Sequence, residues 1–223
     1  MILLTGNTFR NSFSNIRYSF IHIIHWVISG VFIPFYHPYR LMNEDGRQLV
    51  HLVFGLLIAG AIAFLGREYA IMGLTSGLFG GFVLIDLMDR GCRVPIASAM
   101  VENLERTGRM PGYGAVCFVL SALFCLVFFP VDYVVAGVLT LAVLDSVSTI
   151  VGMRFGRHRI SNGKSLEGTA GGIIAAFIPL VFILSPLTAA AAAVVAGIAE
   201  LFSPIEDNLV IPPLICLLCS LLA

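Results

Sequence analysis

Long apolar stretches alternate with polar connections along nearly the whole chain. A helix needs about 20 mostly apolar residues to cross a bilayer, and eight stretches approach this length. The pattern predicts an all-α, polytopic integral membrane protein with seven or eight transmembrane helices. The predicted spans are Phe20–Tyr36, Gln48–Leu65, Tyr69–Leu87, Tyr113–Phe129, Tyr133–Met153, Thr169–Leu184, Leu187–Phe202 and Leu209–Leu222.

The composition favours the same class of protein. Hydrophobic residues make up 58% of the chain and charged residues 12%, whereas soluble domains carry about 25% charged residues. The mean hydropathy of +0.96 leaves little room for a separate soluble domain. The formal net charge is zero, so the overall charge predicts no nucleic-acid partner. We divide the chain into an N-terminal segment, residues 1–40, with an extra membrane helix, and a membrane-embedded domain, residues 41–223.

The connections between the predicted spans alternate between tight turns and longer polar loops. This alternation places all the longer loops on one side of the membrane, together with ten of the thirteen basic residues. The positive-inside rule makes that side cytoplasmic. The tight turns are Gly66–Glu68, Pro130–Asp132 and Ser185–Pro186, and the longer connections are His37–Arg47, Met88–Gly112 and Arg154–Gly168, with the short Ser203–Asn208 link on the same side.

The stretch from Asp145 to Gly172 combines basic residues and glycines between two apolar runs. Arginine and lysine supply positive charge, and glycines let backbone amides approach phosphate oxygens. We therefore expect this loop to bind an anionic ligand at the membrane surface, with Arg157, Arg159 and Lys164 at its phosphate groups.

Acidic residues lie on the same predicted side as this loop. Asp145 ends an apolar run, and a carboxylate at that depth is costly unless it faces a cation, a cavity or a partner. We expect Asp145 to bind Mg²⁺ on a nucleotide, with Ser146 and Thr149 in its environment. Glu200, Glu206 and Asp207 follow later in the chain and are candidates for holding metal or accepting a proton.

Further charged residues precede two predicted helices on this side. Arg47 and His51 open the second helix at i, i+4 spacing, and Glu105 and Arg106 belong to a charged segment before the fourth. We expect these four side chains to line the site. Their shared position on one face of the membrane is stronger evidence for a site than any one of the four residues alone.

Small residues mark predicted helix contacts. Gly73, Gly77 and Gly81 repeat at four-residue spacing in the third predicted helix, and Gly168 and Gly172 do so at the start of the sixth. Because close backbone approach drives helix association in lipid, both sets are interpreted as packing positions.

Three sequence blocks occur in a fixed order over about residues 44–213. The first block is Arg47-Gln-Leu-Val-His51. The second block is Asp145 followed by Gly152-Met-Arg-Phe-Gly156, Arg157-His158-Arg159-Ile160 and Lys164-Ser165-Leu166-Glu167-Gly168-Thr169. The third block is Glu200 followed by Asp207-Asn208-Leu209-Val210-Ile211-Pro212. These blocks resemble the membrane-embedded CTP-dependent lipid kinases: dolichol kinase, phytol kinase and yeast-type diacylglycerol kinase.

The resemblance implies transfer of the γ-phosphate of CTP to the hydroxyl of a membrane lipid alcohol, foremost an isoprenoid alcohol such as dolichol or another polyprenol. It implies Mg²⁺ or another divalent cation, held by Asp145 and Asp207 with Glu206 or Glu167 as the next choice of ligand. Asp145, Asp207 and Glu200 are the implied catalytic acids, with Asp207 or Glu200 as the base. The implied nucleotide-binding residues are Arg157, His158, Arg159, Lys164, Ser165, Glu167, Gly168 and Asn208.

Alternatives remain open at the level of sequence. The related CTP:phosphatidate cytidylyltransferases share an acid-Ser start and a glycine-rich end, which Asp145-Ser146 and Glu167-Gly168-Thr169-Ala170-Gly171-Gly172 also match. Against them, this chain has Ser161-Asn162-Gly163 where they carry a longer proline- and lysine-rich stretch. A non-catalytic membrane protein such as a transporter would have acids in mid-helix and inverted repeats. No residue distinguishes the alcohols or sets the oligomeric state.

Overall fold

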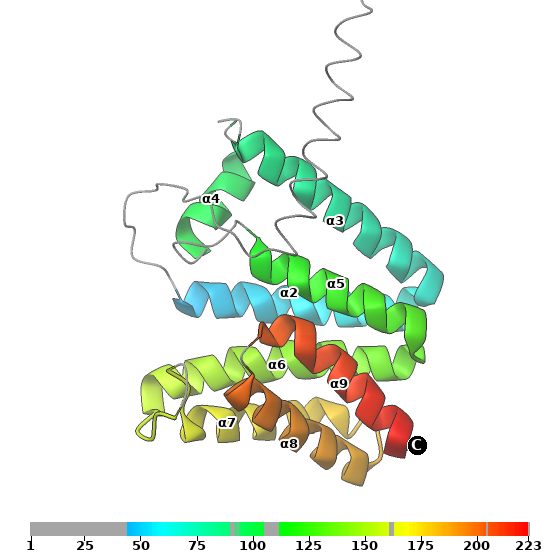
Figure 1. Cartoon of the computed structure of the whole chain (residues 1–223), viewed down its shortest axis with the longest axis vertical. Coiled ribbons are helices and arrows are strands. Elements are labelled where there is room, and N and C mark those ends of the chain that lie inside the picture. The colour runs from blue at the N-terminus through cyan, green and yellow to red at the C-terminus, as the bar shows by residue number, and fades with distance from the viewer. Residues whose placement is uncertain are drawn as a thin grey trace, which may run out of the picture.

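The computed structural model describes residues 44–89, 92, 94–104, 112–160, 163–203 and 205–222. Regular structure in these ranges is helical, apart from one isolated bridge between Arg159 and Ser165. The predicted span Phe20–Tyr36 and the N-terminal segment, residues 1–40, lie outside the described residues. The helices in Figure 1 are α2 (Glu44–Leu65), α3 (Arg67–Asp89), α4 (Pro95–Leu104), α5 (Tyr113–Phe128), α6 (Val131–Phe155), α7 (Leu166–Leu180), α8 (Pro186–Phe202) and α9 (Asp207–Leu222).

By length and composition, α2, α3 and α6 can each cross a membrane. The apolar helices α5, α7, α8 and α9 are shorter, at 15 to 17 residues. Both groups coincide with predicted spans, and their apolar character is compatible with a membrane protein. The number of crossings and the cytoplasmic side of the loops stay predictions.

Helix α4 was not predicted. It occupies ten residues of the Met88–Gly112 connection, which the sequence pattern assigned to a polar loop. The segment is too short to be predicted as a membrane span. The signal for its start is Pro95 at the first helical position, where the missing N–H of proline costs nothing. The Ser98 hydroxyl accepts a hydrogen bond of 3.1 Å from the Val94 N–H just before the helix.

Helix α6 is the centre of the bundle and packs against α2, α7, α8 and α9 (Figure 1). Its contact with α7 depends on glycine. A Cβ atom on Gly168 would lie 2.5 Å from the Ser148 carbonyl oxygen, and one on Gly172 would lie 2.9 Å from the Leu144 carbonyl oxygen. The predicted packing role of these two glycines is therefore confirmed.

Among the described residues, the same prediction is not confirmed for α3. A Cβ atom on Gly73, Gly77 or Gly81 would meet no described atom within 4 Å. Small residues permit close packing only where a second helix approaches them, and the neighbouring α2 and α5 approach α3 elsewhere. Gly77 and Gly81 instead line a cavity.

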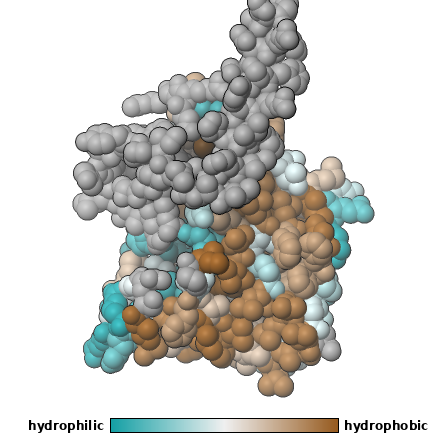
Figure 2. Space-filling view, viewed as in Figure 1, coloured by the Kyte–Doolittle hydropathy of each residue, from teal (hydrophilic) through white to brown (hydrophobic). Residues whose placement is uncertain are grey.

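The two ends of the bundle differ in chemistry. At one end, Arg67 donates a 2.7 Å hydrogen bond to the Phe129 carbonyl oxygen and so joins the α2–α3 turn to the end of α5. The opposite end gathers the starts of α2, α7 and α9 with the ends of α6 and α8 (Figure 1). Figure 2 shows apolar surface between hydrophilic side chains at the two ends. The chain thereby brings its three sequence blocks to one end.

Candidate active site

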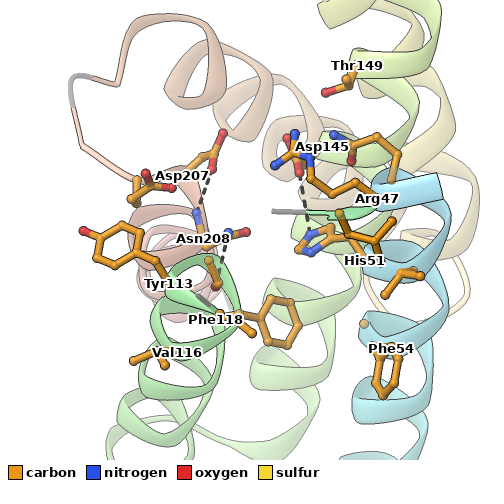
Figure 3. A pocket seen from close by; sticks show the side chains of 18 of the residues that line it. Arg47, His51, Phe54, Tyr113, Val116, Phe118, Asp145, Thr149, Asp207 and Asn208 are labelled. Carbon is orange, nitrogen blue, oxygen red and sulfur yellow. Dashed lines mark hydrogen bonds and ion pairs between the residues drawn. The ribbon is translucent and has the colours of Figure 1, made fainter. Parts of the chain in front are cut away.

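Three carboxylates from three helices converge at this end. Asp145 of α6, Glu200 of α8 and Asp207 of α9 each offer an oxygen, and these oxygens lie within 4.8 Å of one another. Figure 3 shows Asp145 and Asp207 facing the same cavity from opposite walls. More than fifty residues separate Asp145 from Glu200 in the sequence, so helix packing creates this cluster.

Lys164 balances part of the negative charge. Its ammonium nitrogen lies 2.9 Å from Glu200 Oε1 and 3.0 Å from Asp207 Oδ2, and it donates a 2.8 Å hydrogen bond to the Glu200 carbonyl oxygen. Burial by itself lowers the pKa of the Lys164 ammonium, but the two carboxylates outweigh burial and raise that pKa above its ordinary value. Lys164 is also the single lysine of the sequence.

Two hydroxyl groups complete the surroundings of Glu200. Ser148 donates a 3.1 Å hydrogen bond to Glu200 Oε1, and Thr169 donates one of 3.3 Å to Oε2. With 3% of its surface exposed, Glu200 needs these partners, because a buried carboxylate without them is costly. Both of its oxygens are therefore engaged within the protein.

The hydrogen bonds from the Ser148 and Thr169 hydroxyls to Glu200 were not predicted from the sequence. The helical spacing from Asp145 to Ser148, i to i+3, placed Ser148 on the same face and was the available signal. Ser146, which was expected near Asp145, instead donates a 3.1 Å hydrogen bond to the Gln48 carbonyl oxygen and joins α6 to α2. Thr149 does line the cavity (Figure 3).

Arg47 and His51 form the α2 wall of the site. His51 Nε2 lies 3.7 Å from Asp145 Oδ2, too far for a hydrogen bond but close enough for attraction when the ring is protonated. Arg47 pairs with Glu44 one turn earlier. Below them the His51 ring packs edge-on against Phe118, with ring centroids 5.6 Å apart.

The α6–α7 connection is a closed, hydrogen-bonded loop that presents Lys164. Ile160 N–H donates to the Lys164 carbonyl oxygen at 2.9 Å, and Leu166 N–H donates to the His158 carbonyl oxygen at 3.1 Å. Ser165 caps α7 by accepting a 3.1 Å hydrogen bond from Gly168 N–H. This pairing ties Lys164 to Ile160 and the start of α7 to His158, and Lys164 reaches the acids of α8 and α9.

The predicted nucleotide-binding residues separate into two groups. Arg159, Lys164, Ser165 and Asn208 line the cavity. The other four support the loop or its packing. The Glu167 carboxylate accepts hydrogen bonds from the Arg157 and His158 N–H groups and pairs with His158 Nδ1 at 2.5 Å, while Gly168 packs against α6.

The remaining predicted residues have different outcomes. Glu206 lines the cavity, but the three-carboxylate group contains Glu200 in its place. Arg47 and His51 line the cavity as expected, whereas Glu105 and Arg106 lie outside the described residues.

The cavity has a volume of about 1080 Å³. Its lining residues divide into a polar set and an apolar set, and we call the parts of the cavity that they line the polar limb and the apolar limb. The polar limb is bounded by the carboxylates, Lys164, Arg159, Arg47 and the starts of α7 and α9. The apolar limb runs between α2, α3, α4 and α5. Its main lining side chains are Phe54, Ile58, Leu78, Leu84, Ile85, Met88, Met100, Val116 and Val119.

The polar limb fits a divalent cation. Carboxylate oxygens are ligands that Mg²⁺ prefers, and Mg²⁺ commonly uses one or two of them together with phosphate oxygens. Two oxygens on one Mg²⁺ lie at most about 4.2 Å apart, so small side-chain rotations suffice to bring two of these carboxylates onto one ion. Lys164 and Arg159 line the cavity beside them and add positive charge that attracts phosphate oxygens.

Comparisons with known proteins find relatives of this chain by sequence. The chain is 32% identical over 179 residues to uncharacterized protein MJ1137 of Methanocaldococcus jannaschii, and the match covers 77% of the chain and 90% of that protein. It is 32% identical over 151 residues to a phytol kinase of Synechocystis, across 64% of the chain and 59% of the kinase. The chain thus spans about three fifths of the phytol kinase's length. No protein-family model and no solved structure matches it.

Proposed function

The chain belongs to one family with uncharacterized protein MJ1137, and we propose that it is a lipid kinase within that family. The reaction is transfer of the γ-phosphoryl group of CTP to the hydroxyl of a membrane lipid alcohol, of the dolichol or polyprenol type. Similarity to a phytol kinase supports the lipid-kinase class. The choice of CTP and of an isoprenoid acceptor comes from the resemblance of the three sequence blocks.

The observation that carries this proposal is the cluster of Asp145, Glu200, Asp207 and Lys164 where a polar and an apolar limb of one cavity meet. Phosphoryl transfer depends mainly on positioning and on neutralising charge. A lipid kinase must also bring a charged nucleotide and an apolar acceptor to one point. The cavity offers separate surroundings for each.

Each side chain has a proposed role in this reaction. Asp145 and Asp207 are the metal ligands, with Glu206 nearby; Mg²⁺ bound there would neutralise phosphate charge. Lys164 and Arg159 bind phosphate oxygens. Glu200 orients Lys164, because its side chain is almost fully buried and pairs with the Lys164 ammonium group. Asp207, whose side chain is 19% exposed, is the better candidate than Glu200 for accepting the proton of the acceptor hydroxyl.

The test is an assay of the purified protein with Mg²⁺ and a panel of polyprenol, phytol and diacylglycerol. Parallel reactions contain [γ-³²P]CTP, [γ-³²P]ATP or [α-³²P]CTP, the last with phosphatidic acid. We expect γ-label from CTP in polyprenol phosphate. Label from ATP would overturn the choice of donor, and label in phytol or diacylglycerol alone would overturn the choice of acceptor. Label from [α-³²P]CTP in phosphatidic acid would identify a cytidylyltransferase and overturn the kinase.

A further inference from the structure

The apolar limb continues directly from the carboxylate cluster into the bundle. One face of α3 lines it, through positions 77, 78, 81, 84, 85 and 88, which recur with the spacing of a single helix face. Helix α2 contributes Phe54 and Ile58 from the opposite wall. From His51, at the polar limb, to Ile58 is seven residues, or about 10 Å along the helix axis.

Gly77 and Gly81 keep the α3 wall of this limb open. Neither would bring a Cβ atom within 4 Å of a described atom, so these glycines take no part in packing between the described helices. Leu84, which lines the limb, is also 38% exposed, so the apolar lining continues to the surface of the described protein. An apolar cavity that adjoins an apolar surface suits a hydrocarbon chain that comes from surrounding lipid.

The two limbs meet beside polar groups of α2 and α9. His51 packs against Phe118, which marks the change from polar to apolar lining. Asn208, next to Asp207, is 8% exposed. Its amide donates a 3.3 Å hydrogen bond to the Gly114 carbonyl oxygen, whereas its Oδ1 has no hydrogen-bond partner among the described residues. A hydroxyl group is the donor that such an acceptor lacks.

We infer that the apolar limb holds the first segment of the acceptor's hydrocarbon chain, with the acceptor hydroxyl at Asn208 and Asp207. The inference rests on the proposed lipid kinase and names its acceptor site. Because the α3 positions that line the limb, 77 to 88, span about 16 Å along the helix axis, the limb contacts only the part of the chain next to the hydroxyl. The remainder of a long chain lies in lipid, so total chain length has little effect on recognition.

Two leucine substitutions test the limb. Gly77→Leu and Gly81→Leu each place a side chain in the limb, with a Cβ atom that would meet no described atom within 4 Å. Gly73→Leu and Gly80→Leu are matched controls, because they lie on the same helix, have equally open Cβ positions and do not line the cavity.

The first measurement compares kcat/KM for a long polyprenol with that for a five-carbon prenyl alcohol. We expect the ratio to fall at least about tenfold in the two limb variants, the factor that about two buried methylene groups contribute, and to stay unchanged in the controls. An unchanged ratio in an active limb variant would overturn the inference while leaving the kinase intact. An equal fall in the controls would also overturn it.

The second measurement does not require catalysis. A polyprenol analogue with a diazirine within the first ten carbons is photo-cross-linked to the full-length protein in lipid nanodiscs, and the adduct is mapped by peptide mass. We expect an adduct on α2, α3 or α5 that unlabelled polyprenol displaces and that Gly81→Leu abolishes. If the adduct forms there but the protein transfers no phosphoryl group, the result would support binding of the hydrocarbon chain in the limb and reject the proposed kinase activity. No displaceable adduct in the limb, as when another part of the chain fills it, would overturn the inference.

Discussion

The ammonium group of Lys164 lies 2.9 Å from the carboxylate of Glu200. Glu200 belongs to α8 and follows Lys164 by 36 residues in the sequence. Glu200 is almost fully buried, and Lys164 is partly exposed to the cavity. One member of the pair therefore belongs to the helix packing, and the other faces the space where a ligand would bind. Mutating Lys164 alone and together with Glu200 therefore distinguishes the contribution of the pair to stability from its contribution to activity.

Replacing Lys164 with methionine should lower both stability and activity. The substitution leaves the buried Glu200 carboxylate without its cation. Breaking a fully buried pair costs about 3–5 kcal/mol, and we expect about 2 kcal/mol here because the Lys164 side chain is 28% exposed. Thermal unfolding in detergent measures the loss. The double variant with Glu200→Gln should recover most of the stability yet stay inactive; recovered activity would remove Lys164 from the chemistry.

The raised pKa of Lys164 should appear in its chemical reactivity. Only the neutral amine reacts with amine-directed reagents, so a raised pKa slows labelling near pH 8. Asp207→Asn removes one carboxylate that raises this pKa, so labelling should become faster, by about tenfold for each pKa unit lost. Because Lys164 is the single lysine, peptide mass spectrometry follows it without interference.

Nucleotide binding gives the same labelling experiment a second use. CTP with Mg²⁺ should protect Lys164 if its ammonium group binds phosphate oxygens, and CTP with EDTA should protect it less. The control is cytidine, which lacks phosphates. Equal labelling in all samples would contradict the proposed contact between Lys164 and the nucleotide.

Asp145→Asn should abolish activity while leaving the fold intact. An amide keeps the size of the side chain but removes a charge that Mg²⁺ would bind, and loss of such a group costs about 100-fold or more in rate. The rate of γ-phosphate transfer at several Mg²⁺ concentrations measures the effect, with the thermal midpoint as the control for folding. A fully active variant would remove Asp145 from the site.

Gly168→Ala should destabilise the protein. The new Cβ atom would lie 2.5 Å from the Ser148 carbonyl oxygen, and overpacking of this kind costs about 1–3 kcal/mol. Gly60→Ala in α2 is the matched control, because nothing lies within 4 Å of its Cβ position; helix propensity there favours alanine by about 0.5–1 kcal/mol. A stable Gly168→Ala protein with only a raised KM for CTP would restore this glycine to nucleotide binding.

The sequence determined the helical class and the position of most helices, because long apolar stretches in a chain with 12% charged residues leave few other solutions. It also identified Asp145, Lys164, Glu200 and Asp207 as candidates, since charged groups beside apolar helices are costly and so stand out. Local spacing could not reveal Ser148 and Thr169 as partners of Glu200, nor that Glu206 lies outside the group of three carboxylates.

Helix packing decided the rest. The same four-residue glycine spacing joins α7 to α6 and leaves α3 open beside a cavity, because the spacing specifies a smooth helix face but not what lies against it. Likewise, the basic loop is one segment in the sequence, yet its folded shape directs Lys164 to the acids and ties Glu167 to His158. The sequence supplies the charges, and the distances between them depend on which helices meet.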